Sequence, residues 1–190
     1  MVEHYNITDK TNSDTNLPRS RSDTLPNLWA GNCFGCSPKN QYGLKLQIRL
    51  TDNGCISYAK VPDQYCGFDG IVHGGIIATL LDEISAWTLI IRTLKLGVTQ
   101  KATVKYYKPV PVNTSVIVEG FLANVNEYTA KTRSYIKDLD GKVLAECSSN
   151  WLFPGFETLA KITGKSTVFI EDMFNTFIVP IKKYLNERKK

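Results

Sequence analysis

The residues near the middle of the chain could together act on a polarised carbonyl group. His73, Gly74 and Gly75 stand directly before a long apolar run, and Asp82 lies inside that run. The first turn of a helix has N–H groups without intrahelical partners and the positive end of the helix dipole, and both stabilise a developing oxyanion. A carboxylate among apolar residues is costly unless it has a partner or a catalytic task. The pattern therefore predicts acyl chemistry that needs no metal ion.

The spacing of Gly74 and Asp82 bears on how such a site is assembled. The two residues are eight positions apart, which is about 12 Å along a helix that rises ~1.5 Å per residue. One carbonyl group cannot contact both within one subunit, whereas two antiparallel copies of the helix would bring Gly74 of one copy beside Asp82 of the other. If both residues act, we expect a homodimer or homotetramer in which each two-fold interface creates two shared sites.

Less specific roles are also open for these residues. Glu83 is a rival acid, but neighbouring helical residues point about 100° apart, so Asp82 and Glu83 cannot face one pocket equally. Glu83 could instead be a surface or salt-bridge residue. Asp82 could be a structural acid that bonds to the backbone or to Ser85, and His73 could be only a turn or cap residue.

Hydrophobic periodicity places two strands before the apolar run and one helix within it. Apolar side chains alternate with charged or polar ones over 44–50, and the turn signal at 52–54 leads into a return strand over 55–61. The run over 75–96 is apolar on more than one face, which predicts a helix buried on most sides. Gly97 is the predicted C′ residue of that helix.

Four more strands are predicted after the helix, joined by short links as a meander. They are expected over 99–108, 115–125, 128–139 and 142–153. An antiparallel sheet curled around a single central helix would bury that helix. The sequence therefore predicts an α+β architecture of the hot-dog kind over residues 28–155.

Both ends of the chain lie outside this expected domain. Residues 1–27 are polar and predict a flexible leader. Residues 156–190 predict a helical extension, which Pro180 should end or kink because proline lacks an N–H group. We expect this helix to pack on the outer face of the sheet or on a neighbouring subunit. The alternative is an apolar helix face with basic flanks that lies on a membrane surface.

Charge and composition argue against several classes of protein. The net charge is +5, and the last nine residues hold five Lys or Arg and one Glu, so the remainder is close to neutral and no nucleic-acid partner is expected. The start has no apolar signal region, and the apolar run is short and interrupted by acids. We therefore expect a cytoplasmic protein with five reduced cysteines and no integral membrane segment.

Other catalytic and metal-binding motifs are poorly supported. Cys33 and Cys36 form one C-x-x-C pair, with no second pair at zinc spacing and no thioredoxin-like βαβ context, so both are expected to be core or turn thiols. No G-x-S-x-G elbow is present, and no glycine-rich phosphate loop with its lysine accompanies the glycine pair. Neither a metal nor a cofactor is expected.

Four segments together resemble a known family. They are His-Gly-Gly at 73–75 with the acid at 82, Cys-Phe-Gly-Cys at 33–36, Tyr-Gly-Leu at 42–44, and the strand end Lys-Tyr-Tyr-Lys-Pro-Val-Pro at 105–111. Over about residues 30–155 the chain resembles the hot-dog acyl-CoA thioesterases, and most closely the phenylacetate-pathway (PaaI-like) branch of the 4-hydroxybenzoyl-CoA thioesterase superfamily.

The resemblance implies an enzyme that hydrolyses an acyl-CoA thioester to a free acid and CoA. Asp82 matches the family's catalytic carboxylate, which acts as a general base or as a nucleophile. The Gly74 N–H matches the donor that polarises the thioester carbonyl, and His73 matches a residue that fixes the turn and assists orientation. The resemblance also implies an active site shared across a homodimer.

Three further positions are assigned to substrate binding. Gly75 follows the donor at the helix start, and Thr99 matches a residue that helps to place water in some members. Gly67 stands six residues before the His, where some members have an Asn, so help from that amide is absent or supplied elsewhere. Two other functions stay open: a hot-dog hydratase or dehydratase, and a non-catalytic acyl-CoA-binding protein that would tolerate loss of Asp82.

Overall fold

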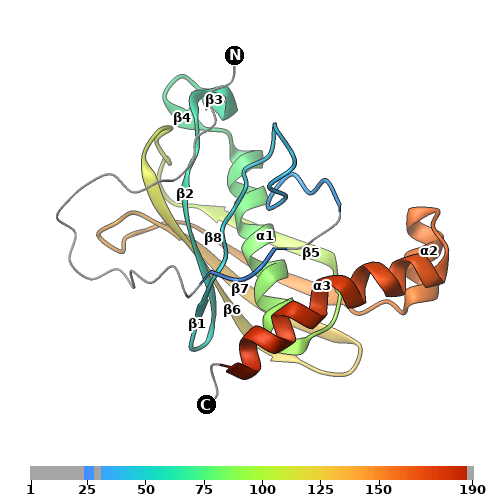
Figure 1. The fold of residues 1–190 in the computed structure, drawn as a ribbon. Coiled ribbons are helices and arrows are strands. Elements are labelled where there is room, and N and C mark those ends of the chain that lie inside the picture. The colour runs from blue at the N-terminus through green and yellow to red at the C-terminus, as the bar shows by residue number, and fades with distance from the viewer. Residues whose placement is uncertain (1–23, 28–30, 188–190) are drawn as a thin grey trace.

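The computed structural model describes residues 24–27 and 31–187 (Figure 1). Most of the predicted leader, together with the last three residues of the basic tail, lies outside the described residues. The final part of that leader, residues 24–27, contacts the domain. Leu25 is buried there, and its N–H donates to the Ile48 carbonyl at 2.8 Å.

An antiparallel sheet of six strands forms the body of the described chain. Its strands are β1 (Arg49–Thr51), β2 (Gly54–Lys60), β5 (Val98–Tyr106), β6 (Ser115–Val125), β7 (Thr129–Lys137) and β8 (Val143–Leu152). Buried and exposed side chains alternate along β7, from buried Ala130 to buried Ile136. This alternation arises because successive side chains of a strand point to opposite faces, and one face of the sheet is covered.

The order of the strands in the sheet differs from the predicted meander. The order is β1-β2-β6-β7-β8-β5, so β5 pairs with β8 at one edge and not with β6. The predicted meander is therefore wrong in its first link, although β6, β7 and β8 do follow one another. Pro109 and Pro111 lie in the link between β5 and β6, and proline cannot continue a strand ladder. The link therefore leaves the edge and crosses to the middle of the sheet.

The long helix α1 (Gly74–Thr93) lies against one face of the sheet (Figure 1). Gly120 of β6 permits this close approach, because a Cβ atom there would lie 2.3 Å from the Thr88 hydroxyl oxygen. The buried Ser134 hydroxyl of β7 donates to the Leu81 carbonyl at 2.9 Å. The predicted α+β architecture, an antiparallel sheet wrapped around one central helix, is confirmed.

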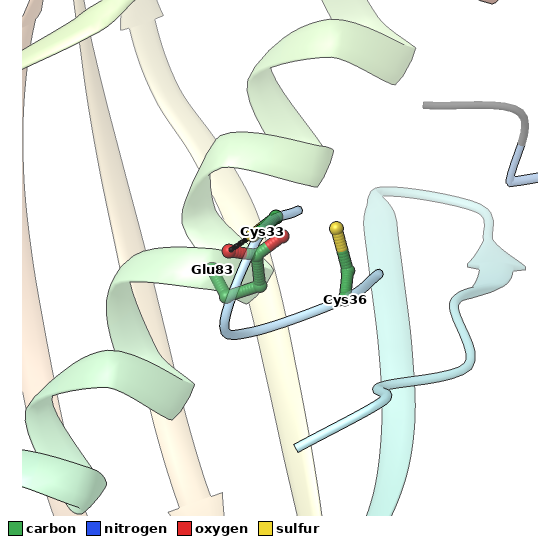
Figure 2. A group of neighbouring side chains, drawn as sticks. All are labelled: Cys33, Cys36 and Glu83. Atoms are coloured by element: carbon green, nitrogen blue, oxygen red, sulfur yellow. Dashed lines mark hydrogen bonds between the residues drawn. The ribbon is translucent and has the colours of Figure 1, made fainter. Parts of the chain in front are cut away.

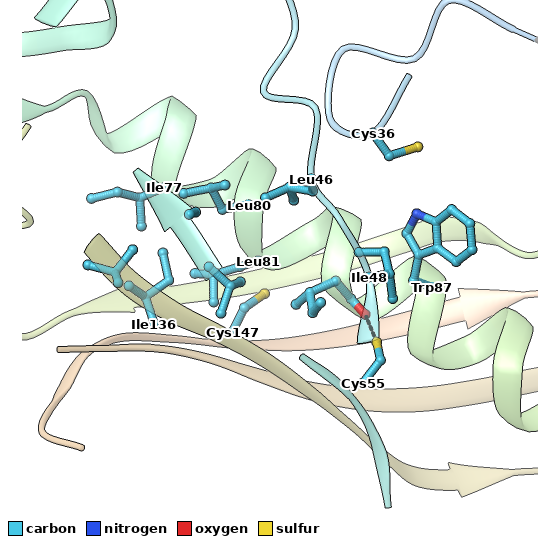
Figure 3. Packing of buried hydrophobic residues seen from close by; sticks show 14 of the residues in the cluster. Cys36, Leu46, Ile48, Cys55, Ile77, Leu80, Leu81, Trp87, Ile136 and Cys147 are labelled. Carbon is cyan, nitrogen blue, oxygen red and sulfur yellow. Dashed lines mark hydrogen bonds between the residues drawn. The ribbon is translucent and has the colours of Figure 1, made fainter. Parts of the chain in front are cut away.

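The apolar composition of α1 reflects its packing. Among the described residues, α1 is the one helix whose length and composition would allow it to cross a membrane. Nine of its side chains are buried, and each fully buried Leu or Ile contributes about 1.5–3 kcal/mol. Figure 3 shows Ile77 and Leu80 lying near Leu46 of the preceding segment, and these residues belong to one buried cluster.

The C-terminal end of α1 is not at the predicted glycine. Leu94 adopts a left-handed conformation with φ of 55° and donates its N–H to the Ile90 carbonyl at 2.8 Å, so the helix ends there. The prediction of Gly97 as the C′ residue is wrong. Gly97 is instead a point of close packing, because a Cβ atom there would lie 2.4 Å from the Leu89 side chain.

The first predicted strand is much shorter than expected. Only Arg49–Thr51 forms β1, although the turn predicted at 52–54 does join it to β2. The segment 44–48 takes no part in the sheet, and the Leu46 N–H donates to the Gly35 carbonyl at 3.0 Å. The alternating apolar side chains bury against the core cluster that includes α1, which gives the same sequence pattern as a half-buried strand.

The C-terminal extension forms two helices, α2 (Phe156–Thr163) and α3 (Thr167–Glu187). The predicted position on the outer face of the sheet is wrong, because α3 packs on α1. The Phe177 ring of α3 lies 5.4 Å from the Trp87 ring of α1 in an edge-on arrangement. Part of the side of α1 that faces away from the sheet is therefore also apolar, and it packs against α3 through this ring pair. Of the two outcomes expected at Pro180, an end or a kink of the helix, the end does not occur, because the helix continues through this residue.

A small hairpin that the sequence did not predict leads into α1. It consists of β3 (Cys66–Phe68) and β4 (Ile71–Val72), and follows the short helix η2 (Asp63–Tyr65). The Val72 N–H donates to the Val110 carbonyl at 2.9 Å, and the His73 N–H donates to the Tyr65 carbonyl at 2.9 Å. These bonds fix the chain just before α1 and place His73 at its first turn.

Candidate active site

His73 is the N-cap residue of α1. Its Nδ1 atom accepts a hydrogen bond from the Gly75 N–H at 2.9 Å, and its carbonyl accepts from the N–H groups of Ile76 and Ile77. Because Nδ1 is an acceptor, a neutral His73 ring carries its proton on Nε2. His73 therefore holds the turn that begins the helix.

Gly74 is the first residue of α1, and its N–H donates to no acceptor among the described residues. The Gly75 N–H, in contrast, is already bonded to His73. The Gly74 carbonyl accepts from the Tyr106 hydroxyl at 3.0 Å. Gly74 is therefore the position at this helix start with an N–H group available to a bound carbonyl oxygen.

Gly67 of β3 lies beside His73. A Cβ atom on Gly67 would lie 3.2 Å from His73 Cα and 3.3 Å from His73 Cδ2. The position thus adjoins the helix start, but glycine supplies no side-chain amide there.

Asp82 lies two turns further along α1 and is held by the first residues of β5. The Thr99 hydroxyl donates to Asp82 Oδ1 at 2.8 Å. Partial burial raises the pKa of the Asp82 carboxyl, and the Thr99 hydrogen bond opposes that rise. Within the described chain Ser85 does not hold Asp82, because its hydroxyl is buried without a partner. A carboxylate that is partly desolvated and oriented by one hydroxyl can accept a proton from water or attack a carbonyl carbon.

The structure does not bring Gly74 and Asp82 together within one chain. Both lie on α1, and their spacing corresponds to about 12 Å along the helix axis. Each is contacted from β5, Gly74 by Tyr106 and Asp82 by Thr99. Because β5 is an edge strand of the sheet, both halves of the candidate site lie along the same open edge.

Glu83 occupies a different side of the helix from Asp82. Trp87 Nε1 donates to Glu83 Oε1 at 3.1 Å, and the Cys33 thiol donates to Glu83 Oε2 at 3.3 Å (Figure 2). Burial raises the pKa of the Glu83 carboxyl to about 7. The alternative of a surface or salt-bridge role for Glu83 is therefore wrong.

The pKa values of the two cysteines beside Glu83 are shifted in opposite directions. The hydrogen bond from the Cys36 thiol is the largest contribution that lowers the pKa of Cys33, which reaches about 5 although burial opposes it. The same hydrogen bond, together with burial, raises the pKa of Cys36 above its usual range. No disulfide joins the two cysteines, and both lie in the turn over 33–37, in agreement with the prediction that they are core or turn residues.

Two features of this region had little or no signal in the sequence. The bond from Tyr106 to Gly74 depends on the path of β5 beside α1, which periodicity does not show. The contact between Cys33 and Glu83 joins residues 50 positions apart. In each case the sequence shows only a polar side chain, and it does not show which distant segment packs beside it.

The part of the chain that carries these residues matches a known family. Residues 69–145 match the model of the Thioesterase superfamily. His73, Gly74, Asp82 and Thr99 all lie inside the matched segment, whereas Gly67 and the two cysteines lie before it. No curated protein matches the chain.

Solved structures show the same fold. A crystal structure of a thioesterase superfamily protein is 25% identical, with a TM-score of 0.56, and the match covers 60% of this chain and 57% of that one. This chain therefore aligns with little more than half of that protein. Zebra fish thioesterase superfamily member 2 is 20% identical with a TM-score of 0.56, and the match covers 62% of this chain and 88% of that chain.

One similar structure contains coenzyme A. It is a hypothetical thioesterase protein from Streptococcus pneumoniae TIGR4, 22% identical with a TM-score of 0.51, and the match covers 56% of this chain and 86% of that chain. In each of these matches about 40% of this chain is left uncovered.

Proposed function

We propose that this protein is an acyl-CoA thioesterase of the PaaI-like branch, which hydrolyses a thioester to a free acid and CoA. The observation that carries the proposal is a pair of groups along β5. At the helix start the Gly74 N–H has no acceptor among the described residues, and Asp82 is partly buried and oriented by Thr99. Both lie in the segment that matches the Thioesterase superfamily, and a structurally similar protein was crystallised with coenzyme A.

In the proposed reaction the Gly74 N–H binds the thioester carbonyl oxygen and stabilises the negative charge that develops on it. Asp82 removes a proton from a water molecule as the water oxygen attacks the carbonyl carbon. The C–S bond then breaks, and the CoA thiolate leaves and takes up a proton. In the alternative route an Asp82 oxygen attacks first, and water hydrolyses the resulting anhydride. Both routes use the same two groups.

We further propose that the active site is shared between two copies of the chain. The spacing of Gly74 and Asp82 on α1 prevents one carbonyl from reaching both. The edge strand β5 is largely exposed, because only Val98 and Val104 of its nine residues are even partly buried, and it is therefore available to pair with another chain. An exposed edge of this length readily pairs with another chain. A two-fold dimer through β5 would place Gly74 of one copy near Asp82 of the other, twice.

Release of free CoA from a panel of acyl-CoAs tests this function. Short, medium, long and aromatic acyl chains would be compared for the wild type and Asp82→Asn, with Asp140→Asn as a matched control in an exposed turn. We expect turnover by the wild type and the control, and a loss of at least ~10²-fold in Asp82→Asn. A folded protein that binds CoA but hydrolyses none of the panel would contradict the proposal and favour a non-catalytic acyl-CoA-binding protein or a hydratase.

A further inference from the structure

A second cluster of reactive side chains lies on the other side of α1 from the Thr99 contact. It is formed by Cys33, Cys36 and Glu83, and it plays no part in the proposed hydrolysis. One donor atom from each residue, the two sulfurs and a carboxylate oxygen, lies within 4.8 Å of the others. Figure 2 shows the loop with both cysteines passing the turn of α1 that carries Glu83. Two thiols and a carboxylate are a ligand set that suits zinc.

A backbone hydrogen bond closes the turn that carries the two cysteines. The Cys33 carbonyl accepts from the Ser37 N–H at 3.1 Å, which closes the turn. This closed turn keeps the Cys33 and Cys36 sulfurs close to each other, and both can bind a metal ion once they have lost their protons.

Two other residues shape the cluster around Glu83. A Cβ atom on Gly35 would lie 2.4 Å from Glu83 Oε2, so a side chain at this position would displace the carboxylate from its present place. Trp87 Nε1 donates to the other carboxylate oxygen at 3.1 Å. Hydrogen bonds of this kind to the outer atom of a ligand orient it toward a metal.

We propose that Cys33, Cys36 and Glu83 form a zinc site that fastens the 31–37 loop to α1. Bonds of ~2.3 Å to sulfur and ~2.0–2.2 Å to oxygen in a tetrahedron place ligand atoms about 3.5–3.8 Å apart. The observed separations, none above 4.8 Å, need only small side-chain rotations to reach this. Zn²⁺ displaces the protons of both thiols and of the carboxyl, and water takes the fourth position. Glu83 adjoins Asp82, so the metal would fix the helix turn that carries the candidate catalytic acid.

Metal binding by the full-length protein tests the proposal without any measurement of activity. The protein would be purified under reducing conditions, stripped with a chelator, and titrated with Zn²⁺ and separately with Co²⁺. We expect one metal ion per chain and, with Co²⁺, the ultraviolet charge-transfer absorption of thiolate ligands. Because only the folded state would form the site, Zn²⁺ should also raise the Tm.

Variants of the ligands, with a matched cysteine control, complete the test. Cys33→Ser, Cys36→Ser and Glu83→Gln should each bind Zn²⁺ at least ~10-fold more weakly. Cys66→Ser removes an exposed cysteine of β3 outside the cluster and should bind as the wild type does. Absence of the thiolate absorption in the wild type would overturn the proposal whether or not the variants fold. A Cys33–Cys36 disulfide in protein purified in air, with no Zn²⁺ uptake after reduction, would overturn it in favour of a redox pair.

Discussion

Replacing Gly74 with proline would remove one N–H group and leave the helix in place. Gly74 is the first residue of α1, the position at which helices accept proline because the N–H there has no intrahelical partner. His73 has φ of −59° and ψ of 137°, the extended conformation that a residue before proline prefers. A Cβ atom at position 74 would make ordinary contact with Tyr106 at 3.7 Å. The variant Gly74→Pro should therefore fold.

The expected effect on catalysis is large and the expected effect on stability is small. Removing one donor to a developing oxyanion lowers kcat by ~10²–10³, or about 2.7–4 kcal/mol. The loss of backbone freedom in the unfolded chain should leave the free energy of unfolding within ~1 kcal/mol of the wild type. Catalytic loss should therefore occur without unfolding.

The matched variant Gly74→Ala adds the same Cβ atom but keeps the N–H group. Hydrolysis at saturating acyl-CoA concentration, monitored by the release of free CoA, would give kcat for both variants. Urea unfolding would give their stabilities. We expect Gly74→Ala to retain most of the wild-type kcat. Equal kcat values for two folded variants would refute the assignment of the Gly74 N–H as the oxyanion donor.

Other substitutions test the groups that support the site and the core. Thr99→Val should lower kcat about tenfold because Asp82 loses its hydrogen bond. Thr99→Ser keeps a hydroxyl and should retain most of the wild-type kcat, and steady-state kinetics would measure this difference between the two variants. His73→Ala should cost about 1 kcal/mol of stability in urea unfolding because the Gly75 N–H loses its acceptor, and His73→Asn, which offers an oxygen, should cost less. Phe177→Ala should destabilise the protein by about 3–5 kcal/mol and lower the midpoint of urea unfolding. An unchanged midpoint would refute the packing of α3 on α1.

The main elements of the fold could be predicted because apolar residues recur with a clearly different period in its strands and in its long helix. β6 was predicted over 115–125 and is observed at Ser115–Val125, since alternation is strong where one face of a sheet is covered. The long apolar helix was also clear. The segment 44–48 was not, because an extended chain packed against the core cluster has the same alternation as a strand. The position of β5 depends on contacts between distant segments, which periodicity does not contain.

The parts of the candidate site that lie close together in sequence were predictable, and the others were not. His73 and Gly74 adjoin each other, so the turn at the start of the helix was visible as a motif. The cluster around Glu83 was not predictable, because a single C-x-x-C pair does not indicate which distant side chain completes it. The third side chain of the cluster is an acid that reaches the cysteines only after the loop packs on α1.

Mixing two inactive variants would test the shared active site most directly. Gly74→Pro and Asp82→Asn would be unfolded together at equal concentrations and refolded, and CoA release would be compared with each variant treated alone. Half of randomly assembled dimers would hold one variant of each kind with one intact site of two, so we predict about a quarter of wild-type activity. Activity no higher than that of the separate variants, in a mixture shown to contain heterodimers, would contradict a site built from Gly74 of one copy and Asp82 of the other.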